Sequence, residues 1–207
     1  MEKHFTEENG IRIYDFQKTF IYLNAYGKHK LGESFNLKKE DAFIIYKLII
    51  YAIRDQENCD RLGIDLNKGI LLNGPVGCGK TSLMTLLKRF TYIDNNYIMK
   101  STRDISAEYN IEGYSTILKY GKSTKIYCLD DLGVEQNMKH FGNECNTIAE
   151  ILLHRYELMQ SQNIVTHATT NLNANELEKI YGNRVRSRLR SMFNLIAFPE
   201  SCKDKRK

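Results

Sequence analysis

Apolar residues gather in five short segments between positions 69 and 198, and each segment is followed by a turn or a helical pattern. Short apolar runs of this kind are typical of buried strands. The predicted strands are Gly69–Leu72, Tyr97–Lys100, Lys125–Leu129, Ile164–Thr169 and Leu195–Phe198. Because strands that alternate with helices need crossover connections, the pattern predicts an α/β fold with a mostly parallel sheet and helices on both of its faces.

Apolar residues at helical spacing occupy much of the sequence between these strands. Thr81–Phe90 carries leucines and a methionine on one side, and Asn146–Met159 repeats apolar residues at the same period. The segment Asn173–Tyr181 ends at Gly182, which suits a helix C-cap, and Asn183 can cap a further helix. These helices are expected to supply the crossover connections.

Composition places the chain among ordinary globular proteins. Of its 207 residues, 42% are hydrophobic and 27% charged, and the net charge of +5 permits an acidic partner without requiring one. The most apolar run, Ala42–Ile53, contains Lys47 and is too short to span a bilayer, so we expect a buried helix and no membrane contact. The five cysteines form no C-x-x-C pair, which favours a reducing, cytoplasmic location over a disulfide framework or a zinc site.

The chain divides into three parts by sequence character. Residues 1–34 are rich in Tyr, Phe, Lys and Glu with weak periodicity, and we interpret them as an arm that either binds a partner or packs on the core. Residues 35–200 hold the alternating pattern and form the predicted α/β core. Residues 201–207 are a charge run, for which a solvated tail is the expectation.

The strongest chemical signal is a glycine-rich loop between the first predicted strand and the next helix. It matches G-x-x-x-x-G-K-[ST] in full, the Walker A pattern. Its residues are Gly74, Pro75, Val76, Gly77, Cys78, Gly79, Lys80 and Thr81, and Ser82 follows in the helix. The N–H groups of such a loop cradle phosphates, while Lys80 reaches the β and γ phosphates and the Thr81 hydroxyl coordinates Mg²⁺. The sequence therefore predicts a binding site for ATP and Mg²⁺.

Two carboxylates end the third predicted strand. Asp130 and Asp131 follow the apolar run Ile126–Leu129, which is the Walker B arrangement. In this arrangement Asp130 holds Mg²⁺ directly or through water, and Asp131 orients or deprotonates the attacking water. Many proteins with this pattern carry glutamate at the second position. Because aspartate is one methylene shorter, we expect slow intrinsic hydrolysis.

The same acidic residues leave a second nucleotide open. Asp130–Gly133 also fits the D-x-x-G motif of GTPases. A GTPase should then carry an N-K-x-D string to read guanine. The nearest string, Asn67–Ile70, lacks the aspartate and precedes the phosphate loop, so ATP is favoured over GTP.

A polar residue and a row of arginines follow the fourth predicted strand. Asn171 ends that strand and is expected to lie beside the acid pair, where it can align water against the γ-phosphate. Further on, Arg184 and Arg188 share one face of a helix, and Arg186 and Arg190 share another. An arginine given to the γ-phosphate of a neighbouring subunit would stabilise charge in the transition state, and Arg188 and Arg184 are the candidates.

Four strings, in order and spacing, resemble those of the DnaC-type helicase loaders, and the IstB-type transposition helpers share the pattern. They are Gly74–Thr81, Cys128–Gly133, Thr169–Asn173 and Gly182–Leu189. Both groups are AAA+ ATPases. The resemblance covers roughly residues 65–200 and implies a three-layer sandwich with a parallel five-stranded sheet of order 5-1-4-3-2, without the helical lid of most AAA+ proteins. It also implies that Asn171 is the sensor and Arg188 the arginine finger.

The resemblance implies a homo-oligomeric ATPase with ATP at its subunit interfaces that acts on DNA and loads a replicative helicase. A transposase is the alternative partner, and residues 1–34 contain no string that decides between the two. In AAA+ proteins of this type the loops after strand two face single-stranded DNA. The basic residues that this arrangement would bring toward the DNA are Lys100, Arg103, Lys119 and Lys122.

Two further classes of function share the phosphate loop. A small-molecule kinase would leave Asn171 and the arginine helix unexplained, and the sequence shows no acceptor site. A nucleotide-dependent binding module with little turnover is compatible with the short side chain of Asp131.

Overall fold

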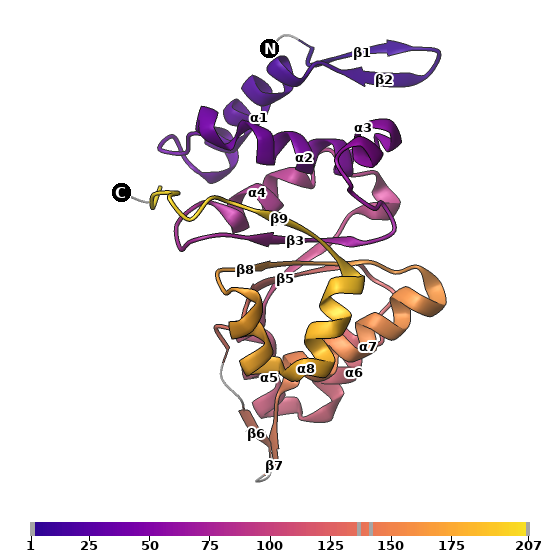
Figure 1. Cartoon of the computed structure of the whole chain (residues 1–207), viewed down its shortest axis with the longest axis vertical. Helices are drawn as coiled ribbons and strands as arrows, with labels where there is room; N and C mark the ends of the chain where they lie inside the picture. The colour runs from indigo at the N-terminus through magenta and orange to yellow at the C-terminus, as the bar shows by residue number, and fades with distance from the viewer. Residues whose placement is uncertain (1–2, 136–137, 141–142, 206–207) are drawn as a thin grey trace.

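A five-stranded sheet separates two layers of helices (Figure 1). This computed structural model describes residues 3–135, 138–140 and 143–205, and neighbouring strands of the sheet pair in parallel. The strands are β3 (Gly69–Asn73), β4 (Ile98–Ser101), β5 (Tyr127–Leu132), β8 (Thr166–Thr170) and β9 (Phe193–Ala197). Their order, β4-β5-β8-β3-β9, is the predicted 5-1-4-3-2 order read from the other edge. The predicted fold class is confirmed.

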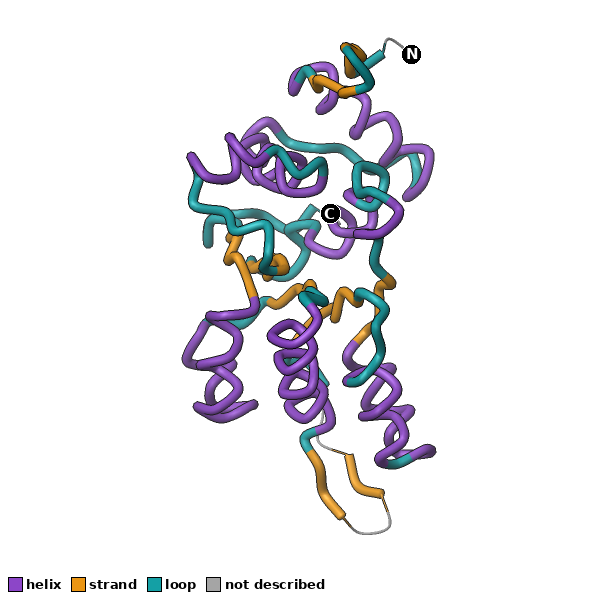
Figure 2. Tube along the Cα trace, turned by 90° about the vertical axis from the view of Figure 1, so that its right-hand side faces the viewer, coloured by secondary structure: helices purple, strands orange, loops and turns teal. Residues whose placement is uncertain are grey.

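Helices cover both faces of this sheet, as the two views at right angles show (Figures 1 and 2). One layer contains α1 (Phe16–Leu31), α2 (Ala42–Ala52), α3 (Gln56–Arg61) and α4 (Lys80–Leu87), with short 3-10 turns at η1 (Lys39–Asp41) and η2 (Ile93–Asn95). The other contains α5 (Thr102–Glu112), α6 (Tyr114–Gly121), α7 (Thr147–Gln162) and α8 (Ala174–Met192). Within the described residues, no helix is both long and apolar enough to cross a membrane.

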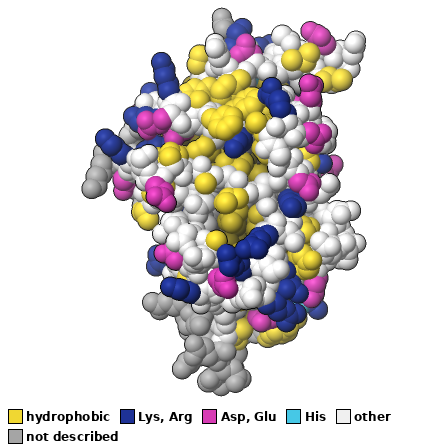
Figure 3. All heavy atoms as spheres, viewed as in Figure 1, with side chains coloured by type: hydrophobic (Ala, Val, Ile, Leu, Met, Phe, Trp, Pro, Cys, Tyr) yellow, Lys and Arg dark blue, Asp and Glu magenta, His cyan; other side chains and the backbone are white. Residues whose placement is uncertain are grey.

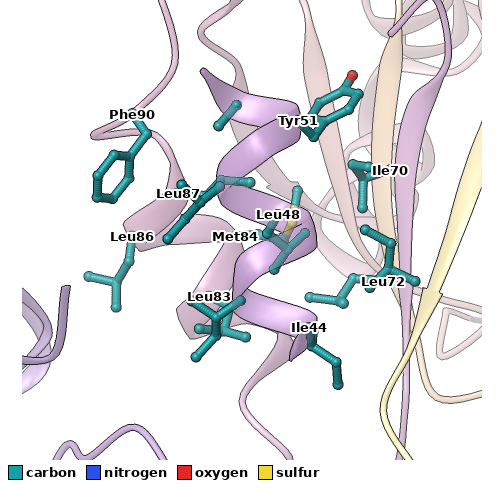
Figure 4. Close-up of a cluster of buried hydrophobic side chains, with 14 of the residues drawn as sticks. Ile44, Leu48, Tyr51, Ile70, Leu72, Leu83, Met84, Leu86, Leu87 and Phe90 are labelled. Atoms are coloured by element: carbon teal, nitrogen blue, oxygen red, sulfur yellow. The ribbon is translucent and has the colours of Figure 1, made fainter. Parts of the chain in front are cut away.

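Alternate residues of β3 point to opposite layers. Ile70 and Leu72 belong to the cluster of buried residues under α1, α2 and α4, whereas Leu71 belongs to the cluster under α5–α8. Figure 4 shows the first cluster, in which side chains of α2, α4 and β3 converge. This packing fixes the start of α4 against the end of β3. The phosphate loop joins these two elements and is therefore held at both ends.

Two antiparallel hairpins extend from opposite ends of the molecule (Figure 1). One pairs β1 (Phe5–Glu8) with β2 (Ile11–Tyr14), and the other pairs β6 (Met138–His140) with β7 (Asn143–Cys145). Neither hairpin was predicted from the sequence, because strands of three or four residues are too short to give a recognisable apolar run.

The described N-terminal residues pack on the core. In α1, Leu23 is buried, and aromatic side chains of the hairpin and of α1 surround it as part of the same cluster as α2 and α4. His4 stacks on Tyr22 at a centroid distance of 3.9 Å, and both rings lie near Phe90, which follows α4. Met1 and Glu2 lie outside the described residues. The remainder of residues 1–34 thus has both an inner face on the core and an outer face.

A kink at Gly182 separates the part of α8 that carries the arginines from the part that precedes it. Helix α8 runs through Gly182, but this residue has φ 82° and ψ 162°, which are not helical values. Asn173 caps the first part and forms a capping box with Glu176. The expected break at Gly182 is therefore present, and Val185 and Leu189 bury one side of the second part.

Candidate nucleotide-binding site

The phosphate loop lies where β3 ends and α4 begins. Gly77 and Gly79 have φ values of 80° and 99°, a backbone region that glycine adopts without a steric penalty. Helix α4 starts at Lys80, so the positive end of its dipole opens onto the loop. These features suit the loop to an anion.

Lys80 is buried and folds back over the loop. Its side-chain Nζ donates hydrogen bonds to the carbonyl oxygens of Gly74 at 2.7 Å and Pro75 at 3.0 Å. Only 6% of the residue is exposed. The ammonium group is therefore positioned at the mouth of the loop by the loop itself.

Thr81 and Asp130 bring two hard oxygen ligands together. The Thr81 hydroxyl lies 3.0 Å from each carboxylate oxygen of Asp130, although one residue comes from α4 and the other from β5. Mg²⁺ prefers such oxygen ligands, and it is usually held by one or two protein groups together with phosphate oxygens. The residues present therefore fit the predicted magnesium site.

Asp131 adopts a strained backbone conformation that two threonines hold in place. Its φ is 60°, a left-handed value that is uncommon outside glycine. The Asp131 N–H donates to the Thr169 hydroxyl at 2.8 Å, and its carbonyl accepts from the Thr102 hydroxyl at 2.8 Å. Such conformations persist where the surrounding structure determines them, and they cluster at functional sites. The strain turns the Asp131 side chain to the pocket that also contains Lys80.

Thr169 links the two acids directly. Its hydroxyl donates to Asp130 Oδ1 at 2.7 Å while it accepts from the Asp131 N–H. Asn171, which the sequence predicts beside the acids, lines the same pocket as Asp131, and Thr169 is the residue of β8 that hydrogen-bonds to both acids. A threonine inside an apolar strand was the only signal in the sequence for this role.

The pKa of Asp130 is raised above its ordinary value. Burial is the largest cause, and the nearby charge of Asp131 adds to it, whereas the hydrogen bond from Thr169 acts in the opposite direction. A buried pair of carboxylates repels itself, and a bound cation relieves that repulsion. The electrostatics of the acid pair therefore favour a cation at Asp130.

A pocket of about 1560 Å³ joins these groups. Predicted site residues that line it are Val76, Gly77, Gly79, Lys80, Thr81, Ser82, Asp131 and Asn171. The Oδ1 atom of Asn171 is buried without a hydrogen-bond partner, as is the Oγ atom of Ser106 on the α5 side of the pocket. Buried polar atoms in proteins are normally hydrogen-bonded. These two atoms are therefore available to a bound water or ligand.

The arginines of α8 lie outside this pocket. Arg184 is exposed, and Arg188 is half-buried, with its guanidinium 5.1 Å from the ring centroid of Tyr156. Arg188 also donates to the Arg184 carbonyl at 3.0 Å, whereas Arg186 pairs with Glu178. Within one chain, the structure does not bring either candidate finger to the phosphate loop.

Solved structures of replication proteins share this architecture. The DnaC helicase loader aligns with a TM-score of 0.50 and 24% identity over 64% of this chain and 79% of its own. A protein described as a primosome component from Streptococcus pyogenes serotype M3 aligns with a TM-score of 0.56 and 16% identity over 80% of this chain and 83% of its own. This chain shares the fold of the DnaC helicase loader. No protein-family model and no curated protein matches the sequence.

AMPPCP-bound DnaA from Aquifex aeolicus also shares this fold and aligns with a TM-score of 0.54 and 19% identity over 86% of this chain and 52% of its own. Beyond β9, the described residues Phe198–Lys205 contain no helix. That segment differs from the solvated tail we expected, because Lys205 forms an ion pair with Asp41 beside the loop. Arg206 and Lys207 lie outside the described residues.

Proposed function

We propose that this protein binds and hydrolyses ATP with Mg²⁺ and uses that cycle, while acting on DNA, to load a replicative helicase. The observation that carries the proposal is the convergence of groups from separate elements in one site: Lys80, the Thr81–Asp130 pair, Asp131 and Asn171. Phosphoryl transfer depends on positioning and on charge stabilisation, and these groups provide both. The AMPPCP-bound DnaA neighbour supports nucleotide binding by this fold.

Each residue has a defined part in the proposed hydrolysis. Lys80 donates to phosphate oxygens, and Thr81 with Asp130 holds the metal ion. Bound Mg²⁺ neutralises charge that develops on the phosphates. Asp131 accepts a hydrogen bond from the attacking water, and Asn171 aligns that water through its otherwise unpartnered side-chain oxygen.

The proposal assigns residues 1–34 to contact with the helicase. Hydrophobic side chains gather over α1 and α2 on the face shown in Figure 3. Ile11 and Ile13 of the hairpin and Ile21 of α1 are 67%, 49% and 69% exposed. Exposed apolar surface of this kind marks sites of protein interaction. The solved helicase loader with the same fold makes a helicase the partner of choice.

DNA contact is proposed for the basic residues near β4 and α6. Lys122 is exposed, whereas Lys119 forms an ion pair with Glu108 and Lys100 lies 5.8 Å from the ring centroid of Tyr120. Arg103 lines the nucleotide pocket. Lys122 is therefore the strongest of the four candidates for a phosphate backbone.

The partner assignment predicts that Ile21→Asp disrupts a complex with the ring helicase encoded by the same genome. A buried, unpaired carboxylate in an apolar interface is costly, so we expect affinity to fall at least about tenfold. Size-exclusion chromatography with ATP present measures complex formation. Ile111→Asp, at an 80% exposed isoleucine of α5, is the matched control and should bind as the wild type does. Formation of a stable complex with a transposase and not with the helicase would overturn the assignment.

Substitutions of Asp131 and Asp130 should affect different steps: the first should slow turnover, and the second should weaken metal binding. Asp131→Asn is expected to bind ATP and Mg²⁺ normally but to hydrolyse about tenfold more slowly, because a neutral amide orients water less well than a carboxylate. Asp130→Asn should weaken Mg²⁺-dependent ATP binding itself. Steady-state ATPase assays and nucleotide titrations with and without Mg²⁺ measure the two effects. Wild-type turnover by Asp131→Asn would exclude the role assigned to Asp131.

The raised pKa of Asp130 predicts that Asp130→Asn remains folded, which serves as a control for the binding measurements. The folded protein holds the Asp130 proton more tightly than the unfolded chain does. The free energy of unfolding therefore decreases as pH rises from the ordinary aspartate pKa through the raised pKa of the folded protein. Without Mg²⁺ near neutral pH, Asp130→Asn should therefore unfold at a temperature no lower than the wild type. Loss of Mg²⁺-dependent binding in such a folded variant is a loss of the ligand set and not of the fold.

A further inference from the structure

The C-terminal segment Pro199–Lys205, which we call the strap, lies along the phosphate loop. Figure 1 shows this end of the chain returning past the layer of α1, α2 and α4. The Lys205 backbone N–H donates to the Gly77 carbonyl at 3.0 Å, and its Nζ donates to the Cys78 carbonyl at 2.9 Å. The strap therefore holds two successive carbonyl groups of the loop.

Two glycines of the loop leave room for this segment. A Cβ on Gly74 would lie 2.7 Å from the Cβ of Phe198, and a Cβ on Gly77 would lie 2.0 Å from a carboxylate oxygen of Asp204. Phe198 is buried, and its N–H donates to the Asn73 carbonyl at 2.8 Å. The strap thus starts from a fixed residue and fits against the loop where side chains are absent.

The ammonium group of Lys205 also contacts a buried carboxylate. Asp41, which precedes α2, is 2% exposed and forms an ion pair with Lys205 Nζ. Buried charges are stable only when they are paired and hydrogen-bonded. The ammonium of Lys205 consequently bridges the start of α2 to the loop, and the ring of Phe198 lies 5.0 Å from it.

Lysines therefore hold four carbonyls of the loop: Lys80 holds those of Gly74 and Pro75, and Lys205 holds those of Gly77 and Cys78. In a planar trans peptide the N–H points away from the C=O of the same unit. Fixing a carbonyl toward the strap turns the N–H of the following residue to the opposite side. The N–H groups are what a phosphate loop offers to its ligand.

We propose that Lys205 is a positioning residue for nucleotide binding: its backbone N–H holds the Gly77 carbonyl and its Nζ joins the Cys78 carbonyl to Asp41, which orders the phosphate loop before ATP arrives. The inference rests on the proposed function and names a residue that no phosphate-loop motif contains. Lys205 lines the nucleotide pocket, but its ammonium is engaged by the Cys78 carbonyl and Asp41, so its assigned role is to position the loop and not to take part in the chemistry. Preorganisation of this kind lowers the ordering cost of binding.

The test uses Lys205→Met, Asp41→Asn and the double variant in the full chain. Lys205→Met removes the ammonium that pairs with the buried Asp41 carboxylate, so a lower melting temperature is expected for this variant. The double variant removes both charges and should recover most of that temperature. ATP affinity should still be about tenfold weaker than wild type in both variants that lack Lys205, because the Cys78 carbonyl has lost its ammonium donor while the backbone contact to Gly77 remains.

Two further readouts separate positioning from general destabilisation. The turnover number at saturating ATP should stay within about twofold of wild type while KM rises about tenfold, because Asp131 and Asn171 are untouched. Lys205→Arg keeps a charged donor and should recover part of the affinity. Lys179→Met, at an exposed position of α8, removes the same charge elsewhere and is the matched control. Wild-type ATP affinity in the double variant would overturn the inference alone. Failure of the wild type itself to bind ATP would instead overturn the proposed function.

Discussion

Replacing Lys80 with alanine is expected to weaken ATP binding on the order of 10³-fold in a protein that remains folded. Two charge-assisted hydrogen bonds to phosphate oxygens, at about 2 kcal/mol each, account for that loss. The fold should survive because Lys80 bonds to loop carbonyls of Gly74 and Pro75 and not to the cores beneath α4. Lys80 itself lines the pocket, so water can enter the space that its side chain vacates.

Titration with a fluorescent ATP analogue measures this effect, and circular dichroism with a melting curve checks the fold. Lys179→Ala removes the same charge from an exposed position of α8 and should leave the affinity unchanged. A folded Lys80→Ala protein that binds ATP as tightly as the wild type would disprove the assignment of the phosphate loop. It would also remove the basis for the role of Lys205.

The local part of this site could be predicted from the sequence. The phosphate loop is a continuous string between a strand and a helix, so its position follows from the motif and its context. The five strands were recognisable because each is a short apolar run, and their order followed from the resemblance to the DnaC-type loaders. The structure added no new candidate to the loop itself.

Contacts between distant segments could not be predicted in the same way. Thr169 bonds to both acids beside a β-bulge between Leu129 and Leu132, and no pattern in the sequence signals that bulge. The left-handed conformation of Asp131 is held by hydrogen bonds to Thr102 at the start of α5 and to Thr169 of β8. Asp41 and Lys205 are 164 positions apart, and each looks like an ordinary surface charge until the strap is in place. Their pairing is a product of the folded topology.

We expect ATP hydrolysis to require two subunits, and loss of the arginine finger should reduce turnover more than Asp131→Asn does. Arg188→Ala should bind ATP normally but lose on the order of 10³-fold in hydrolysis rate, the cost of removing an arginine finger. Arg188 lies outside the pocket of its own chain, packed over Tyr156, and the second part of α8 exposes Arg184 beside it. A head-to-tail interface could bring that face to the next subunit's γ-phosphate, where the guanidinium fork contacts two oxygens at once.

Mixing variants tests whether the finger acts between subunits. Arg188→Ala keeps an intact phosphate loop and Lys80→Ala keeps an intact finger, so one type of mixed interface is complete. Each variant alone should be inactive, and their mixture should recover part of the wild-type rate. Wild-type activity per subunit should also rise with protein concentration, or with single-stranded DNA that gathers subunits. Arg103, which lines the pocket within the same chain, is the competing cation. Concentration-independent turnover that is lost in Arg103→Ala and never recovered on mixing would place the catalytic arginine in the same chain.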